Sequence, residues 1–230
     1  MVAGTGAGRE LRTVVSGRST VTEESLVLSE DAPPLVERAY AVARQAGFPL
    51  TRQEAGPGRP SACLPGVGRF LAMLAASCRG GAIAELGTGA GIGAAWLASA
   101  MPADCTLVTA ELDAGRAAAA AELLAGDARI HVLGGDAGTV LAPHAPFDLV
   151  FADCGVRDAA AFADVCGMLR PGGRIVMDDV TPVLALPADS SFRQADIKRS
   201  LFAGQRGLTW TEVVLPDLAN SLLVGTRRAA

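Results

Sequence analysis

From Gly81 onward, short apolar runs alternate regularly with segments of helical periodicity. The pattern predicts strands at about 82–86, 106–112, 129–133, 147–153 and 174–178. It predicts helices between them, at about 91–100, 114–125, 137–142 and 158–169. Asp113 and Asp158 stand where N-caps are expected. Repeated strand–helix units of this kind indicate a parallel sheet with helices on both faces.

The end of the chain departs from this alternation of strands and helices. A helix predicted near 192–203 is followed by LTWTEVVLP and SLLVGTRR, two strand-like runs. Only Asp217 to Asn220 separate them, too few residues for a crossover helix, so we expect an antiparallel hairpin. Pro171-Gly172-Gly173 predicts a turn into the fifth strand.

The N-terminal part has a weaker pattern. Residues 1–20 are rich in Gly, Arg, Thr and Ser and predict a flexible arm. Residues 21–65 predict a helical cap segment, in which a helix over Glu23–Ala46 precedes a Gly- and Pro-rich loop over 48–65. The expected apolar stripe of that helix is Leu35, Ala39, Val42, Ala43 and Ala46.

A third domain segment covers 66–230. It opens with VGRFLAMLAASC, which predicts a helix ending near Gly80-Gly81, since a glycine C-cap is expected there. The apolar positions at helical spacing are Val67, Phe70, Leu71, Leu74 and Cys78.

Composition excludes several classes of protein. The 230 residues are 50% hydrophobic, enough to bury the core of one large α/β domain. No apolar run reaches the 18 residues of a spanning helix, and a net charge of −4 argues against a nucleic-acid binder. The five cysteines have no CxxC spacing and no signal-peptide pattern is seen, so we expect a cytoplasmic protein with buried thiols.

The stretch AELGTGAGIG, from Ala84 to Gly93, is the first candidate for chemistry. A glycine-rich turn between a strand and a helix N-terminus is where α/β proteins hold nucleotide-like cofactors. Gly89, Gly91 and Ala94 satisfy G-x-G-x-x-G/A, so a nicotinamide-dependent oxidoreductase is an open alternative. Glu85, two residues before the first glycine, would repel a pyrophosphate and favours a cofactor that carries an ammonium group.

Two further acids follow the next strands. Glu111 ends TLVTAEL, where a carboxylate can accept hydrogen bonds from a ribose diol. Asp113 is the competing candidate, but the strand phase and a capping role favour Glu111. Asp136 in GGDAG could accept from an adenine amino group, cap the following helix, or do both.

These motifs, with PFDLVFAD and LRPGGRIVMDD, occur in the order and spacing of class I S-adenosylmethionine-dependent methyltransferases, which residues 61–228 resemble. PGVGRFLAML and LPDLANSLLVGTRR are similar to segments of the catechol and caffeoyl-CoA O-methyltransferases. The resemblance implies a Rossmann-like methyltransferase fold. This is an α/β, doubly wound, mostly parallel seven-stranded sheet with an antiparallel C-terminal strand beside the fifth. Segment 66–230 is then the methyltransferase domain.

The resemblance also implies S-adenosylmethionine as cofactor. Glu85 and the Gly87–Gly91 loop would surround its methionine part, Glu111 would hold the ribose, and Asp136 with Ala137 would flank the adenine. The full set of expected cofactor-binding residues is Glu85, Gly87, Thr88, Gly89, Gly91, Glu111, Leu112, Asp136, Ala137 and Asp153.

Three acids are candidate metal ligands. In metal-dependent relatives, an Asp after strand four and an Asp-Asn pair after strand five hold a divalent cation. Asp153 and Asp178 match this pattern and Asp179 replaces the Asn, so the resemblance implies a site for Mg²⁺ or another divalent cation. Asp153 is also the candidate catalytic residue.

One departure concerns the base. Those relatives carry a lysine three residues after the first metal aspartate, where this chain has Val156. Lys198 is the only lysine and lies far along the sequence, so the relatives' general base cannot be assigned to a residue of this chain. Three readings stay open: the metal suffices, another residue acts, or the site is metal-free.

The expected activity is O-methylation of a small-molecule hydroxyl. The alternatives are the nicotinamide-dependent oxidoreductase and a cofactor-binding protein without turnover. We expect no nucleic-acid or membrane partner, and a homodimer is compatible with the resemblance. His131 and His144 lie away from the strand ends and are not expected to act. The sequence does not identify the acceptor.

Overall fold

The computed structural model describes residues 32–56, 60–156, 158–182, 193–215 and 220–229. The arm expected over 1–20 and the start of the first expected helix, near Glu23, lie outside these residues.

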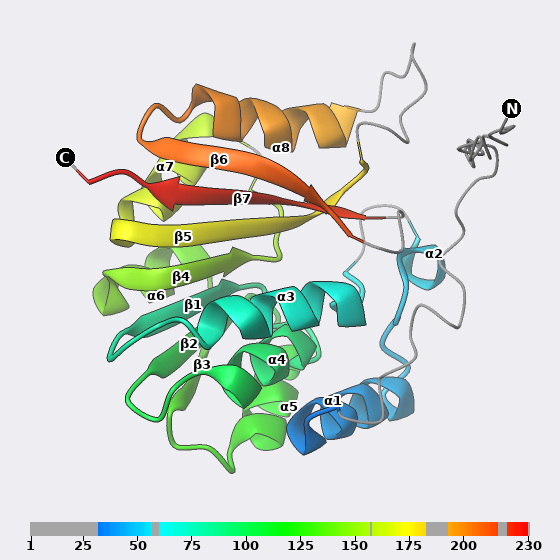
Figure 1. The fold of residues 1–230 in the computed structure, drawn as a ribbon. Coiled ribbons are helices and arrows are strands. Elements are labelled where there is room, and N and C mark those ends of the chain that lie inside the picture. The colour runs from blue at the N-terminus through cyan, green and yellow to red at the C-terminus, as the bar shows by residue number, and fades with distance from the viewer. Residues whose placement is uncertain (1–31, 57–59, 157, 183–192, 216–219, 230) are drawn as a thin grey trace, which may run out of the picture.

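The described strands form one sheet in the order β3-β2-β1-β4-β5-β7-β6 (Figure 1). β1 to β5 pair in parallel, and β7 runs antiparallel to both β5 and β6. The predicted doubly wound sheet, with its C-terminal strand returning beside the fifth, is therefore confirmed. The strands are β1 (Ala82–Leu86), β2 (Thr106–Glu111), β3 (Ile130–Gly134), β4 (Phe147–Ala152), β5 (Leu169–Val180), β6 (Leu208–Val214) and β7 (Ser221–Arg227).

Helices cover both faces of this sheet. α1 (Pro34–Gln45), α3 (Pro65–Ala75), α4 (Ile92–Ala100) and α5 (Ala114–Leu124) contribute to the apolar cluster on one face. α6 (Ala137–Leu141), α7 (Ala159–Gly167) and α8 (Arg193–Gly204) contribute to the cluster on the other, and the turn η2 (Ala142–His144) follows α6. Both faces are apolar because strand side chains alternate: Ile83 enters the first cluster and Ala84 the second.

Aspartates fix where three helices begin. The side chains of Asp113, Asp136 and Asp158 each accept a hydrogen bond from the main-chain N–H three residues later, at 2.8, 3.0 and 2.8 Å. Each bond satisfies one of the N–H groups that a helix start leaves unpaired. The predicted caps at Asp113 and Asp158 are confirmed.

The N-terminal helix differs from its prediction. α1 starts at Pro34, since proline suits the first turn, and its buried residues are Val36, Ala39, Tyr40 and Ala43. The predicted stripe was wrong at Val42 and Ala46, which are exposed. The predicted stripe contained only aliphatic residues and so left out Tyr40. The Tyr40 hydroxyl donates to the Cys63 carbonyl from the buried face of the helix.

Two other boundaries shift. The α3 helix stops at Ala75 and not near Gly80; Ala76 is its C-cap, and the Ser77 hydroxyl donates to the Leu74 carbonyl in the last turn at 2.6 Å. The turn expected at Pro171-Gly172-Gly173 lies inside β5 as an irregularity, where the pairing with β4 jumps from Phe147–Leu169 to Leu149–Arg174. The expected loop over 48–65 contains a short helix, α2 (Arg52–Ala55).

The carboxyl ends of the parallel strands meet at one edge, on the right in Figure 1, where α2 also lies. This edge is where ligands bind in doubly wound sheets. None of the described helices is both long and apolar enough to cross a membrane.

Candidate cofactor and acceptor site

The glycine loop follows β1 directly and lies between the ends of β2 and β4. The main-chain N–H groups of Gly87 and Thr88 donate to the Ala110 carbonyl at 2.9 and 3.1 Å. Gly87 has a φ of +96°, and a Cβ there would stand 2.7 Å from the Asp153 carbonyl oxygen. Only glycine fits, so the loop backbone is held against both neighbouring strands.

Glu85 is fully buried beneath this loop. Its Oε2 accepts a hydrogen bond from the Thr109 hydroxyl at 2.6 Å, and that hydroxyl also pairs with the hydroxyl of Thr88 at 2.6 Å. Its Oε1 has no hydrogen-bond partner in the described part of the chain, and a Cβ at Gly93 would overlap it. A buried carboxylate oxygen without a donor is a place for a ligand's ammonium group.

Burial, with a smaller contribution from the nearby carboxylates of Glu111 and Asp178, raises the pKa of Glu85 to about 8, although the Thr109 hydrogen bond opposes the rise. In the ligand-free protein, Glu85 therefore holds a proton over a pH range in which an unfolded glutamate has lost it.

Glu111 is the second acid of the loop and is 5% exposed. It accepts from the main-chain N–H groups of Gly89 and Asp113, both at 2.9 Å, and from Arg116 at 2.8 and 3.2 Å. Burial alone would raise the pKa of Glu111, but the Arg116 and main-chain hydrogen bonds outweigh it and lower the pKa. Glu111 therefore stays ionised and able to accept hydrogen bonds.

Arg116 was missed by the sequence reasoning. It stands in the first turn of α5, five residues after Glu111, which is a signal that the sequence does contain. Leu112 lies between Glu111 and the helix and is 76% exposed, unusual for a large apolar side chain. An apolar surface thus faces solvent beside the carboxylate.

Asp136 is exposed and caps α6, with Thr139 donating to the same carboxylate oxygen from its N–H at 3.0 Å and its hydroxyl at 2.9 Å. The capping alternative is therefore realised, while a contact of Asp136 and Ala137 with adenine stays a prediction. His131 and His144 are exposed, in β3 and η2.

The structure brings three acids together at the ends of β4 and β5. Asp153, Asp178 and Asp179 each offer a carboxylate oxygen, and these oxygens all lie within 4.8 Å of one another. Asp179 has a φ of +59°, a backbone conformation that aspartate and asparagine tolerate better than most residues. Burial, followed by repulsion from the carboxylates of Asp178 and Asp179, raises the pKa of Asp153 well above its ordinary value.

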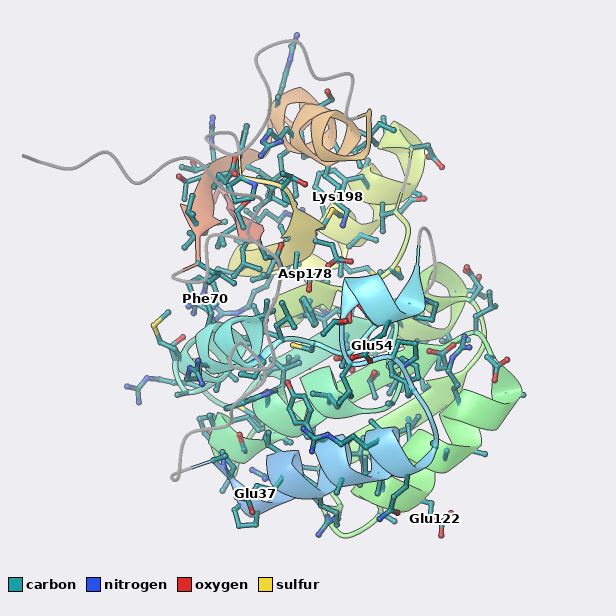
Figure 2. All side chains as sticks on the ribbon, turned by 90° about the vertical axis from the view of Figure 1, so that its right-hand side faces the viewer. Glu37, Glu54, Phe70, Glu122, Asp178 and Lys198 are labelled. Carbon is teal, nitrogen blue, oxygen red and sulfur yellow. The ribbon has the colours of Figure 1, made fainter. Side chains whose placement is uncertain are left out.

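A cation from a distant segment reaches this acid cluster. Lys198, on α8, donates from Nζ to the main-chain carbonyl of Asp178 at 2.6 Å, and Figure 2 shows the two residues beside each other. Lys198 lies far from Asp153 along the sequence, but α8 packs against β5 and returns it to this edge. Val156 is 7% exposed and packs in the apolar cluster of α7 and α8.

The segment before α3 covers the same edge. Cys63 is buried, and burial, followed by the carboxylates of Asp178 and Asp153, raises the pKa of its thiol well above the ordinary range. Phe48 lies against the glycine loop, 3.4 Å from where a Cβ of Gly89 would stand. The role of residues 21–65 as a cap over the site stays a prediction.

The burial of Glu85 predicts a pH-dependent stability. Because its folded pKa is raised, the folded protein binds more protons than the unfolded chain between about pH 4.5 and pH 8, so stability falls as pH rises through this window. The slope approaches about 1.4 kcal/mol per pH unit for one proton. In urea unfolding at pH 5.5 and 8, Glu85→Gln should lose less stability than the wild type. An equal loss in both proteins would show that Glu85 does not titrate in this range.

Comparison with known proteins gives a consistent result. Residues 84–180 match the family model of a methyltransferase domain. A protein from Mycobacterium avium (strain 104), provisionally named an O-methyltransferase, is 35% identical over 161 residues, which cover 67% of this chain and 69% of the relative.

Solved structures agree with this. An O-methyltransferase from Klebsiella pneumoniae, also named provisionally, is 25% identical with a TM-score of 0.69, covering 87% of this chain and 92% of its own. The O-methyltransferase TomG from Streptomyces achromogenes, solved in complex with S-adenosylmethionine and involved in tomaymycin synthesis, is 27% identical with a TM-score of 0.66. That match covers 90% of this chain and 94% of TomG. The chain belongs to the class I S-adenosylmethionine-dependent methyltransferases.

Proposed function

We propose that this protein transfers the methyl group of S-adenosylmethionine to a hydroxyl oxygen of a small molecule at the carboxyl edge of the sheet. The observation that carries the proposal is the glycine loop flanked by Glu85, with its unpartnered buried oxygen, and by the ionised Glu111. The names of the relatives, which specify O-methyl transfer, support oxygen as the acceptor atom.

Each part of the cofactor has a matching group on this edge. Oε1 of Glu85 would accept from the cofactor's ammonium, and Glu111 would accept from the ribose diol. Leu112 would cover the adenine ring and lose its exposure to water. The remaining contacts are expected from Gly87, Thr88, Gly89, Gly91, Asp136, Ala137 and Asp153.

In the reaction, the acceptor oxygen attacks the methyl carbon along the line of the S–CH₃ bond. The O–CH₃ bond forms as the S–CH₃ bond breaks, the electron pair stays on sulfur, and the hydroxyl proton leaves to water. The protein's main contribution is to hold donor and acceptor in this alignment, which replaces a bimolecular encounter by an oriented one. The buried Cys63 and the half-buried Phe48 would help to exclude water from the sulfonium.

A divalent cation is the finer part of the proposal. Three carboxylate oxygens within 4.8 Å of one another can share one hard cation such as Mg²⁺. The carboxylates repel one another, and a bound cation would reduce this repulsion. Asp153, Asp178 and Asp179 would hold it. When bound, such a cation supplies positive charge that favours the ionised form of the acceptor hydroxyl.

The function is tested by incubating the purified protein with S-adenosylmethionine and a panel of catechols, phenols and aliphatic alcohols. We expect S-adenosylhomocysteine and a methylated acceptor by mass spectrometry, and calorimetric binding of S-adenosylhomocysteine but not of NAD. Binding of NAD alone would favour the oxidoreductase. Tight S-adenosylhomocysteine binding without turnover of any acceptor would favour a cofactor-binding protein.

Glu111→Ala should weaken S-adenosylhomocysteine binding, because the ribose diol loses its charged acceptor. Hydrogen bonds to charged groups contribute about 1.5–3 kcal/mol, so we expect a loss of roughly 10- to 100-fold in affinity by calorimetry. Asp113→Asn is the matched control, since asparagine keeps the cap of α5 and should leave affinity unchanged. Equal affinities in wild type and Glu111→Ala would remove Glu111 from the ribose site.

For the cation, EDTA should abolish methyl transfer to catechol, and Mg²⁺ in excess should restore it, because the three acids then lack their shared positive charge. Binding of S-adenosylhomocysteine, measured in the same buffers, serves as the control and should change little. Full activity in EDTA would refute the metal site and leave Asp153 to act without one.

A further inference from the structure

We propose that Lys198 is a catalytic residue of this enzyme, whose ammonium group holds the ionised oxygen of the acceptor beside the Asp153–Asp178–Asp179 cluster. The inference rests on the proposed O-methyl transfer and names the side chain that receives its acceptor.

Lys198 lies beside the end of β5. Its Nζ donates to the Asp178 carbonyl at 2.6 Å, so the ammonium sits at the end of β5, one residue from Asp179. An ammonium has three donors, and this bond uses one of them. Lys198 is half-buried, and Figure 2, which faces the carboxyl edge of the sheet, shows it on this side of the molecule.

The helix that carries Lys198 is fixed to the sheet. The next residue, Arg199, donates to both carboxylate oxygens of Glu212 on β6, at 2.8 and 2.9 Å, and to the Thr181 carbonyl at 2.6 Å. Ser221 on β7 donates to the same carboxylate at 2.6 Å. This network is largely buried, and a two-point guanidinium–carboxylate contact has a defined geometry. The backbone that carries Lys198 is therefore held in a defined position at the carboxyl edge of the sheet.

The charges around it explain why a cation is needed here. Three carboxylates converge at the place where an acceptor oxygen must become negative, and they would repel it. Lys198 brings a positive charge to this cluster, through its bond to the Asp178 carbonyl.

The chemistry uses the ammonium without changing it. A positive hydrogen-bond donor placed where negative charge gathers on a reacting oxygen stabilises that charge most when the site excludes water. The proton of the acceptor hydroxyl passes to solvent before methyl transfer, and the ionised oxygen that Lys198 holds then attacks the methyl carbon. Val156, buried among apolar side chains, cannot supply this contact.

The test measures acceptor binding as well as turnover. The probe is 4-nitrocatechol, whose visible absorbance reports its ionisation, added to the complex of the protein with S-adenosylhomocysteine near the probe's own ionisation midpoint. We expect the wild type to bind the ionised form, and Lys198→Met to bind it roughly 10- to 100-fold more weakly, the worth of a charged hydrogen bond. Turnover of catechol should fall in parallel, and Lys198→Arg should recover part of both.

Ser200→Ala, at an exposed position of the same helix, is the matched control and should behave as the wild type. Melting temperature and S-adenosylhomocysteine affinity should be the same for all variants, which separates a lost contact from a lost fold. Lys198→Met that binds and methylates like the wild type would overturn the role of Lys198 and leave the proposed function standing. A wild type that binds the cofactor but neither binds nor methylates any acceptor would overturn both.

Discussion

The site depends on the parallel pairing of β1 with β2 on one side and with β4 on the other. This pairing ends all three strands at the same edge, and the chain must then leave β1 through a gap bounded by the Ala110 and Asp153 main chains. Only a residue without a Cβ passes at Gly87. The same pairing sets Glu85 beside Thr109, so the loop, the buried acid and the acids of the neighbouring strands form one unit.

The electrostatics of this edge divide into two regions. At Glu111, a guanidinium and two main-chain N–H groups keep a carboxylate ionised. At Glu85 and Asp153, burial dominates and the carboxylates hold their protons more tightly. The lowered pKa of Glu111 suits a ligand that brings a ribose to the first region. The raised pKa values of Glu85 and Asp153 suit a ligand that brings positive charge to the second. S-Adenosylmethionine, with its ammonium and sulfonium, is a molecule of this kind.

Much of the fold could be predicted from the sequence because the strands are short, apolar and separated by capped helices. Asp113 and Asp158 mark helix starts through bonds to residues three positions on, which a linear pattern can show. Predictions failed where a side chain acts across the fold. Tyr40 lies on the buried face of α1, where its hydroxyl contacts Cys63, 23 positions away, and no periodicity encodes that contact.

The sequence by itself therefore determined the alternation of strands and helices, the C-terminal hairpin and the glycine loop, since these rest on local patterns, while the resemblance of its motifs indicated the family. The tertiary structure alone decided which charges share a site. Lys198 meets Asp178, 20 positions away, because α8 packs back on β5. Electrostatic interactions depend on distance in space, and the sequence records only distance along the chain.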